Sequence, residues 1–227
     1  MTDEPVPIVG GTGALGFGLA LRWAAAGIPV VIGSRSKERA EESAGKLREQ
    51  CPDAQVEGLE NDDAAQRGPI VMLAVPFRNQ SENLTNLKEV LEDGQIVIDA
   101  TVPLAAAVSG RATRLLGVPQ GSAAEQAQEM VPSGVRVVSA LHTVGAAKLG
   151  DLDQGLDEDI PVAGDDGDAK RAVADLIRRI DGLRPIDCGR LEIARLIEGI
   201  TPLLISVNSR HKTHAGVRFT ELPEPKW

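Results

Sequence analysis

The sequence predicts an α/β fold with a doubly wound, mostly parallel sheet and a small C-terminal helical cap. Apolar runs of strand length alternate with helical patterns along most of the 227 residues, which is typical of βαβ units. The first apolar run leads straight into a glycine-rich turn, Gly11-x-Gly13-x-x-Gly16, and this turn opens a helical pattern. Together these observations favour a Rossmann-type domain that binds a dinucleotide.

The first half of the chain alternates between strand and helix. Gly27 and Pro52 stop the first two helical patterns, because neither residue continues a helix well. Pro5 and Pro7, just before and within the first strand, are unfavourable for a strand, since each lacks the N–H that would donate to a neighbouring strand. The elements expected here are a strand at Val6–Val9, a helix at 14–26, a strand at 29–32, a helix at 37–49, a weaker strand at 55–59, a strand at 70–76, a helix at 81–91 and a strand at 95–101.

The second half of the chain is less regular. Residues 102–121 show no clear pattern and are expected to form a loop over the sheet. We expect one dinucleotide-binding domain over residues 1–188, followed over 189–227 by a C-terminal helix and a basic tail that act as a cap or an oligomer contact. The elements expected here are a helix at 123–130, strands at 135–142 and 160–163, a helix at 169–180, a strand at 184–188 and a helix at 191–208.

Composition narrows the class of protein. The net charge of -9 argues against a binder of nucleic acid or of anionic membranes. The first residues lack the pattern of a signal peptide, and no apolar run is long enough to span a bilayer, so we expect a cytoplasmic protein. Cys51 and Cys188 stand far apart and suit two free thiols. The chain has no Tyr, which excludes mechanisms that use a tyrosine proton donor.

The three glycines of the turn suit a bound pyrophosphate for separate reasons. Gly11 permits a tight turn, Gly13 lets the phosphates approach the backbone, and Gly16 lets the helix pack closely on the strand. The N–H groups at the start of the helix, together with the helix dipole, then hold the anion. Thr12 adds a hydroxyl that can donate to a phosphate oxygen.

The end of the second strand indicates which nucleotide is bound. NAD-selective domains place Asp or Glu there, to accept a hydrogen bond from the ribose 2′-hydroxyl. This chain has Ser34, Arg35, Ser36 and Lys37 instead. Hydroxyl and cationic groups donate to a 2′-phosphate, whereas a carboxylate would repel it. The alternative is a helix cap at Ser36 with solvated charges, but cations at a helix N-terminus oppose the helix dipole, so we predict NADP(H).

Several segments of the chain resemble one family of enzymes. They are "GGTGALGFGLALRWAAAGIPVVIGSR", "VVSALHTVGAAKL", "PVAGDD", "IDGLRPIDCG", "RLIEGITPLL" and "HAGVRF", in this order along nearly the whole chain. The chain is similar to the NADPH-dependent coenzyme F420 reductases, also called F420H2:NADP oxidoreductases. This resemblance implies reversible hydride transfer between NADP(H) and the deazaflavin coenzyme F420, by a Rossmann-type domain that works as a homodimer or higher oligomer.

The resemblance also implies roles for single residues. The glycine turn would hold the pyrophosphate, Val75 and Pro76 would border the nicotinamide, and residues 142–144 would line the deazaflavin pocket. Gly145 departs from the family, which has proline there, and residues 102–121 match least. The cofactor-binding residues expected from the turn, the strand end and the resemblance are Gly11, Thr12, Gly13, Ala14, Leu15, Gly16, Ser34, Arg35, Lys37, Val75, Pro76, His142, Thr143 and Val144.

Hydride transfer between two rings needs no catalytic side chain, since the protein only has to align the rings and exclude water. No triad-like or metal-ligand spacing is visible, so we expect no catalytic residue and no metal. His142 suits either a deazaflavin contact or a satisfied histidine at a strand end. Asp99 and Thr101 suit a loop-stabilising hydrogen bond better than a cofactor contact, and the acids of 163–168 suit a helix cap.

Two other functions stay open on the sequence alone. One is an NADPH-dependent reductase of another flavin or of a small imine or carbonyl, for which only His142 or a lysine such as Lys148 could donate the proton. The other is a non-catalytic NADPH sensor. The tail with His211 and His214 suits either a solvated basic face or a contact with the acidic side arm of the deazaflavin.

Overall fold

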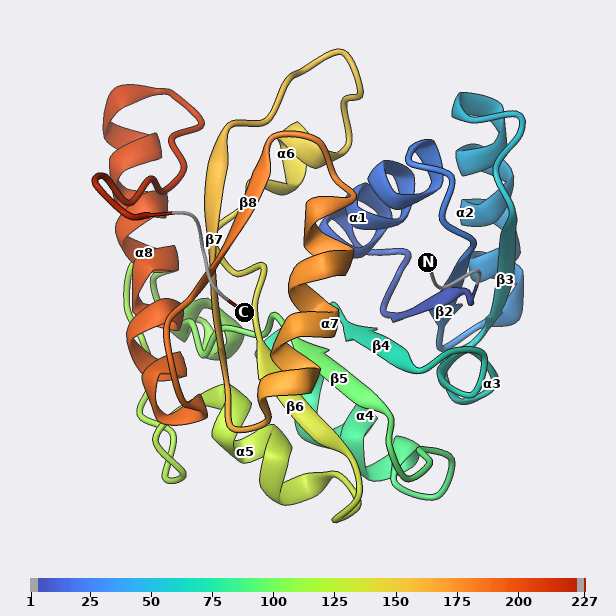
Figure 1. Ribbon diagram of the computed structural model, residues 1–227, viewed down its shortest axis with the longest axis horizontal. Helices are drawn as coiled ribbons and strands as arrows, with labels where there is room; N and C mark the ends of the chain where they lie inside the picture. The colour runs from blue at the N-terminus through green and yellow to red at the C-terminus, as the bar shows by residue number, and fades with distance from the viewer. Residues whose placement is uncertain (1–3, 224–226) are drawn as a thin grey trace.

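The computed structural model describes residues 4–223 and 227, and within them eight strands form one sheet. All neighbours up to β6 run parallel, β7 runs antiparallel to β6, and β8 runs parallel to β7 (Figure 1). The prediction of a doubly wound, mostly parallel sheet is confirmed. In spatial order the strands are β3 (Val56–Glu60), β2 (Val30–Ser34), β1 (Val6–Val9), β4 (Ile70–Leu73), β5 (Ile96–Asp99), β6 (Arg136–Ser139), β7 (Glu158–Gly164) and β8 (Leu183–Asp187).

Helices cover both faces of the sheet over two buried apolar clusters. One cluster includes Ile8 and Trp23 and lies under α1, α2 and α7, whereas the other includes Val9 and Leu84 and lies under α3, α4 and α5. Consecutive residues of β1 thus point to opposite faces, as a strand requires. The helices are α1 (Ala14–Ala25), α2 (Lys37–Gln50), α3 (Asn61–Ala65), η1 (Phe77–Asn79), α4 (Gln80–Leu87), η2 (Ala105–Val108), α5 (Ala123–Met130), α6 (Ala146–Leu149), α7 (Gly167–Arg178), η3 (Leu191–Ile193) and α8 (Ala194–His211).

The proline in the first strand is accommodated by the register of the sheet. The N–H of Val6 donates to Pro29 of the β2 side at 2.9 Å, so the nitrogen of Pro7 faces β4. Pairing between β1 and β4 starts only at Ile8, opposite Met72. The missing N–H of Pro7 therefore lies where the ladder has not yet begun.

Several predicted elements begin or end elsewhere in the structure, and two short helices were not expected. The strand expected at 135–142 ends at Ser139, because the chain leaves the sheet and Leu141 adopts a φ of 66°. The helix expected at 81–91 begins earlier, with a 3₁₀ turn at Phe77, and ends at Leu87. α3 and α6 were not expected, since helices of five and four residues are too short to show a period.

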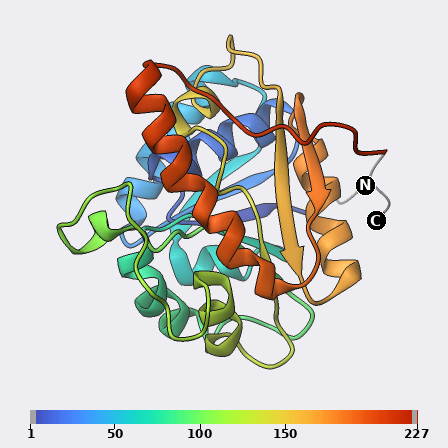
Figure 2. The same cartoon turned by 90° about the vertical axis from the view of Figure 1, so that its left-hand side faces the viewer.

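α8 and the chain after it lie across the end of the molecule that holds β7 and β8 (Figure 2). The N–H of Asp159 donates to Val217 at 2.8 Å, and the N–H of Phe219 donates to the Asp159 carboxylate at 2.6 Å. Arg218 pairs with the same carboxylate at 3.2 Å. The tail is thus fastened to the start of β7. Within residues 4–223 and 227 there is no helix with the length and apolarity to span a membrane.

Candidate functional site

The glycine turn connects β1 to α1 through a backbone conformation that favours glycine. Gly10 has a φ of 78°, so this residue, rather than Gly11, supplies the left-handed conformation of the turn. Gly11 donates its N–H to Ile8 at 3.0 Å and to Gly33 at 2.9 Å. Gly11 was expected to permit the tight turn, and it does so by its lack of a side chain rather than by its φ, because a Cβ on Gly11 would lie 2.9 Å from the Ile8 oxygen.

Gly13 and Gly16 occupy different environments. A Cβ on Gly16 would lie 2.8 Å from both Gly10 and Gly11, so Gly16 lets α1 approach the strand end, as predicted. A Cβ on Gly13 would meet no atom of the described chain closer than 3.3 Å, and Gly13 is exposed. Gly13 is also the N-cap of α1, without a side-chain cap and without an acidic residue in the first turn. The start of α1 therefore offers its N–H groups to an anion.

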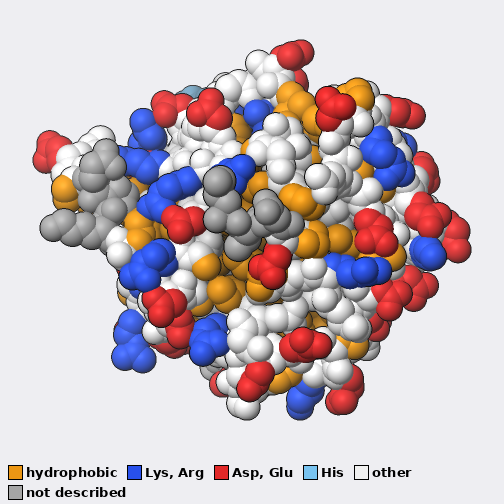
Figure 3. Space-filling view, turned by 45° about the vertical axis from the view of Figure 1, so that its right-hand side comes forward, with side chains coloured by type: hydrophobic (Ala, Val, Ile, Leu, Met, Phe, Trp, Pro, Cys, Tyr) orange, Lys and Arg blue, Asp and Glu red, His pale blue; other side chains and the backbone are white. Residues whose placement is uncertain are grey.

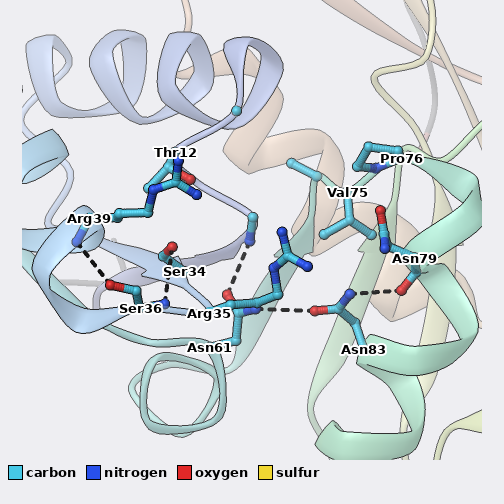
Figure 4. A pocket seen from close by; sticks show the side chains of 13 residues that line it. Thr12, Ser34, Arg35, Ser36, Arg39, Asn61, Val75, Pro76, Asn79 and Asn83 are labelled. Carbon is cyan, nitrogen blue, oxygen red and sulfur yellow. Dashed lines mark hydrogen bonds between the residues drawn. The ribbon is translucent and has the colours of Figure 1, made fainter.

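A cavity of about 180 Å³ opens beside this turn (Figure 4). It brings together six of the predicted residues, from the ends of β1, β2 and β4: Thr12, Gly13, Ser34, Arg35, Val75 and Pro76. Gly11, Ala14, Leu15 and Gly16 shape the turn behind it and do not line it. Among the described residues that line the cavity, none is Asp or Glu.

Arg39 takes the place that the sequence suggested for Lys37. Arg39 lines the cavity and points into it together with Arg35 (Figure 4). Lys37 does not line it and instead lies 3.9 Å from Glu41 on the exposed side of α2. Ser36 caps α2 by accepting from the N–H of Arg39 at 3.4 Å, as the helix-cap alternative predicted. The four-residue spacing of the two arginines is the signal that would have found Arg39.

Three asparagines, Asn61, Asn79 and Asn83, also line the cavity (Figure 4). Asn61, at the start of α3, accepts from the N–H of Gly10 at 3.3 Å and donates to Asn83 at 3.1 Å. Asn83 then donates to the carbonyl of Asn79 at 2.7 Å (Figure 4). Asn61 and Asn83 are both buried. Sequence reasoning missed this chain of amides, because no local pattern links residues 51 positions apart.

The segment after β6 holds the residues predicted for the second cofactor. His142, Thr143 and Val144 are buried, and they do not line the cavity at Thr12. Among the described residues, both ring nitrogens of His142 and the hydroxyl of Thr143 have no hydrogen-bond partner. The carbonyl of His142 accepts from the Thr201 hydroxyl of α8 at 3.0 Å. Burial lowers the pKa of His142 to about 3, so the free protein holds a neutral imidazole there.

Asp99 and Thr101, at and after the end of β5, form hydrogen bonds with other groups of the protein. The N–H of Thr101 donates to Asp99 at 2.6 Å, and the amide of Gln80 lies 2.8 Å from the Thr101 hydroxyl. Burial raises the pKa of Asp99 to about 6. The loop-stabilising interpretation is confirmed for both residues.

The acidic segment before α7 is a cap. Asp166 accepts from the N–H of Ala169 at 2.8 Å and from Arg136 at 2.8 Å. Asp165 lies 3.1 Å from Arg190. No group of three or more metal-ligating side chains occurs in the part of the chain that the structure describes.

Sequence comparisons place the chain among known enzymes. It is 47% identical to the F420-dependent NADP reductase of Methanocaldococcus jannaschii, over 96% of this chain and 98% of that one. It is 43% identical to the F420-dependent NADP reductase of Methanothermobacter thermautotrophicus, over 96% of each chain. Residues 5–103 match the family model for "NADP oxidoreductase coenzyme F420-dependent".

The chain belongs to the F420-dependent NADP reductase family. A solved structure agrees with this membership. The crystal structure of a candidate F420-dependent NADP reductase from Arthrobacter sp. FB24 superposes with a TM-score of 0.73 at 25% identity, over 93% of this chain and 96% of that one. These matches cover 96% of this chain, so membership in the F420-dependent NADP reductase family rests on nearly its whole length and not on the glycine turn alone.

Proposed function

We propose that this protein is an F420-dependent NADP reductase that transfers hydride reversibly between NADP(H) and coenzyme F420. The observation that carries the proposal is the cavity at the end of β2, with two arginines, two serines and no acidic residue among its described lining, in a chain of this family. The cofactors would bind at the carboxyl edge of the sheet, near the point where the strand order reverses direction, between β1 and β4.

The cavity fits the adenosine half of NADP(H) better than that of NAD(H). Arg35 and Arg39 would donate to the 2′-phosphate, with the hydroxyl of Ser34 beside them. The open backbone at Gly13 and the uncapped start of α1 would hold the pyrophosphate. Val75 and Pro76, which follow β4, would border the nicotinamide. Lys37 is left out of this assignment because it faces Glu41.

The buried segment after β6 fits a second planar cofactor. Two imidazole nitrogens and one hydroxyl are buried there without a partner in the part of the chain that the structure describes, which is costly unless a ligand satisfies them. His142 and Thr143 would hydrogen-bond the deazaflavin, and Val144 would pack against it. When bound, the deazaflavin supplies the ring carbon that accepts or releases hydride. The neutral His142 would donate or accept a hydrogen bond rather than contribute a charge.

The alternative function, a carbonyl or imine reductase, needs a proton donor, and the two candidate donors Lys148 and His142 are poorly suited to this role. Lys148 is held at 2.9 Å from the buried carboxylate of Glu158. His142 is neutral and 7% exposed. A general acid must carry a proton that it can release at the working pH, whereas a neutral imidazole with so low a pKa is not protonated and an ammonium held by a buried carboxylate is engaged elsewhere. The protein's own work is therefore to bind two cofactors, orient them and exclude water.

We further propose that residues 1–188 bind the nucleotide and that 189–227 form a cap through which two copies of the chain associate. α8 exposes an apolar stripe at the spacing of one helix face. Leu196 is 58% exposed and Leu203 is 61% exposed, with the half-buried Ile200 and Val207 continuing the same face. A homodimer would cover this stripe, and equilibrium sedimentation tests it.

An absorbance assay with purified protein tests the proposed activity. With NADPH and oxidised coenzyme F420, the visible absorbance of the deazaflavin should fall, and NADH should give a much slower change. The same assay with riboflavin in place of the deazaflavin checks the flavin alternative. NADPH binding without turnover of any acceptor would contradict the enzymatic proposal and favour the sensor.

A further inference from the structure

The two cofactor regions are connected through a contact between α1 and α6, which lie side by side (Figure 1). α1 starts at the glycine turn, and α6 starts two residues after Val144. A Cβ on Gly18 of α1 would lie 2.6 Å from the Cβ of Leu149, so the two helices approach at backbone distance. Leu149 itself is fully buried.

Arg22 lies one turn further along α1, and its side chain binds backbone carbonyls at the end of α6 and just after it. Its Nη2 donates to the carbonyls of Lys148 at 2.6 Å and of Gln154 at 2.7 Å, and also reaches that of Asp151. Its Nε donates to the carbonyl of Leu149 at 3.1 Å. The last carbonyls of a helix have no partner within the helix, so this guanidinium satisfies them from a neighbouring element. Only the planar fork of arginine offers several donors at once in fixed directions.

α6 has few other attachments that could fix its place. It has four residues, too few to be stable alone, and its N-cap Gly145 makes no side-chain cap. On its other side Lys148 pairs with the buried Glu158 of β7 at 2.9 Å. The position of α6, and of the His142–Val144 segment before it, therefore depends on α1 on one side and on β7 on the other.

We propose that Arg22 is a positioning residue for hydride transfer, because by holding α6 on α1 it sets the separation between the phosphate turn and the His142–Val144 segment. This inference rests on the proposed function. Arg22 does not line the cavity and is not part of the His142–Val144 segment. It would therefore affect the distance between the two cofactors rather than the binding of either one. Transfer between two rings is steeply sensitive to their separation, and a displacement of about 1 Å can cost about a hundredfold in rate.

The experiment compares hydride transfer with cofactor binding in the wild type and in three variants. Arg22→Lys keeps the charge but has one donor nitrogen, which cannot replace both Nε, bound to Leu149, and Nη2 of the planar guanidinium. Gly18→Ala keeps Arg22 and adds a carbon against Leu149. The matched control is Arg179→Lys, since Arg179 also donates to a carbonyl at the end of α1, that of Ala26 at 3.1 Å, but makes no hydrogen bond to α6 within the described residues.

We expect the rate of hydride transfer to fall while the affinity for each cofactor stays nearly unchanged. Single-turnover oxidation of NADPH by saturating F420 should slow by about ten- to hundredfold in Arg22→Lys and in Gly18→Ala, with the dissociation constant of each cofactor within about threefold of wild type. The slowed step should show a primary isotope effect with NADPH deuterated at C4. Arg179→Lys should keep the wild-type rate.

Two results would overturn the inference. The first is a wild-type rate of hydride transfer in both Arg22→Lys and Gly18→Ala. The rates are compared at temperatures at which circular dichroism shows that both variants are folded. The second is a loss of NADPH affinity as large as the loss of rate, since Arg22 would then support the nucleotide site itself. An inactive wild-type protein would overturn the proposed function and this inference with it, whereas an active wild type with equally active variants overturns the inference alone.

Discussion

The backbone N–H of Gly10 donates to the side-chain oxygen of Asn61 at 3.3 Å, and this bond joins the glycine turn to the start of α3. Gly10 is the residue whose φ of 78° shapes the turn. Asn61 donates in turn to Asn83 of α4, so the turn is held by two helices from a later part of the chain. The proposed pyrophosphate site would therefore be preformed by tertiary contacts as well as by its glycines.

Replacing Asn61 with Ala should weaken both nucleotides equally. The change leaves the N–H of Gly10 and the amide oxygen of Asn83 without partners, at a cost of about 1–3 kcal/mol. We expect the affinities for NADPH and for NADH to fall by the same factor, about tenfold, in a fluorescence titration. Asn86→Ala, on the exposed side of α4, is the control. A loss confined to NADPH would show that Asn61 contacts the 2′-phosphate instead.

Replacing Arg39 with Ala should weaken the binding of NADPH but not that of NADH. Loss of a charged hydrogen bond to the 2′-phosphate costs about 1.5–3 kcal/mol, and NADH lacks that group. NADPH affinity should therefore fall by about ten- to hundredfold, with little change for NADH. Arg35→Ala should behave in the same way. Lys37→Ala, one residue from the cap at Ser36, is the matched control and should leave both affinities unchanged.

Replacing Gly13 with Val should block the pyrophosphate in a folded protein. The added carbons would stand at the exposed start of α1, where no atom of the described chain is closer than 3.3 Å to the Cβ. Thermal unfolding should change little, while calorimetric titration should detect no binding of NADPH. Gly45→Val in α2, where nothing lies within 4 Å of the new Cβ, controls for the substitution itself. Retained NADPH affinity would refute this placement of the phosphates.

Glu198 should make stability depend on pH. Its carboxylate accepts from the N–H groups of Ala123 and Ala124 at the start of α5, at 3.1 and 3.2 Å. Burial raises the pKa of Glu198 from 4.5 to about 8. The folded protein therefore binds this proton more tightly than the unfolded chain, and the stability present below pH 4.5 is lost as the pH rises through about 8.

Urea unfolding across that range checks this linkage. In Glu198→Gln the free energy of unfolding should fall less steeply with pH than in wild type, because the variant has no group to titrate at this position. The buried Asp99, with a pKa of about 6, remains in both proteins and titrates lower in the range. Parallel pH profiles for wild type and Glu198→Gln would show that the carboxyl of Glu198 does not take part.

The parts of the site that the sequence predicted are those with a local signal. The glycine turn, the strand before it and the polar residues at the end of β2 follow one another within 40 residues, and their chemistry can be read without knowing the fold. The cap at Ser36 is equally local. The strands were recognisable because both faces of the sheet are covered, which gives continuous apolar runs.

The parts that were missed depend on which elements become neighbours. Asn61 and Asn83 meet only because α3 and α4 pack on the same face of the sheet. The reversed direction of β7 was equally hidden, since an apolar run does not tell the direction of a strand. Residues 140–157 stay at the carboxyl end of β6, with only the four-residue α6 between the strands, so β7 starts there and runs back.

Transfer of a deuterium label tests the central claim most directly. NADPH deuterated on either face of C4 is mixed with the protein and oxidised F420 in ordinary water, and the reduced deazaflavin is analysed by mass spectrometry and proton NMR. Direct transfer between the two rings predicts that one of the two labelled forms delivers its deuterium to the deazaflavin ring carbon. Reduced deazaflavin without deuterium from either form would contradict the account, because hydrogen would then have passed through the solvent or through a protein group.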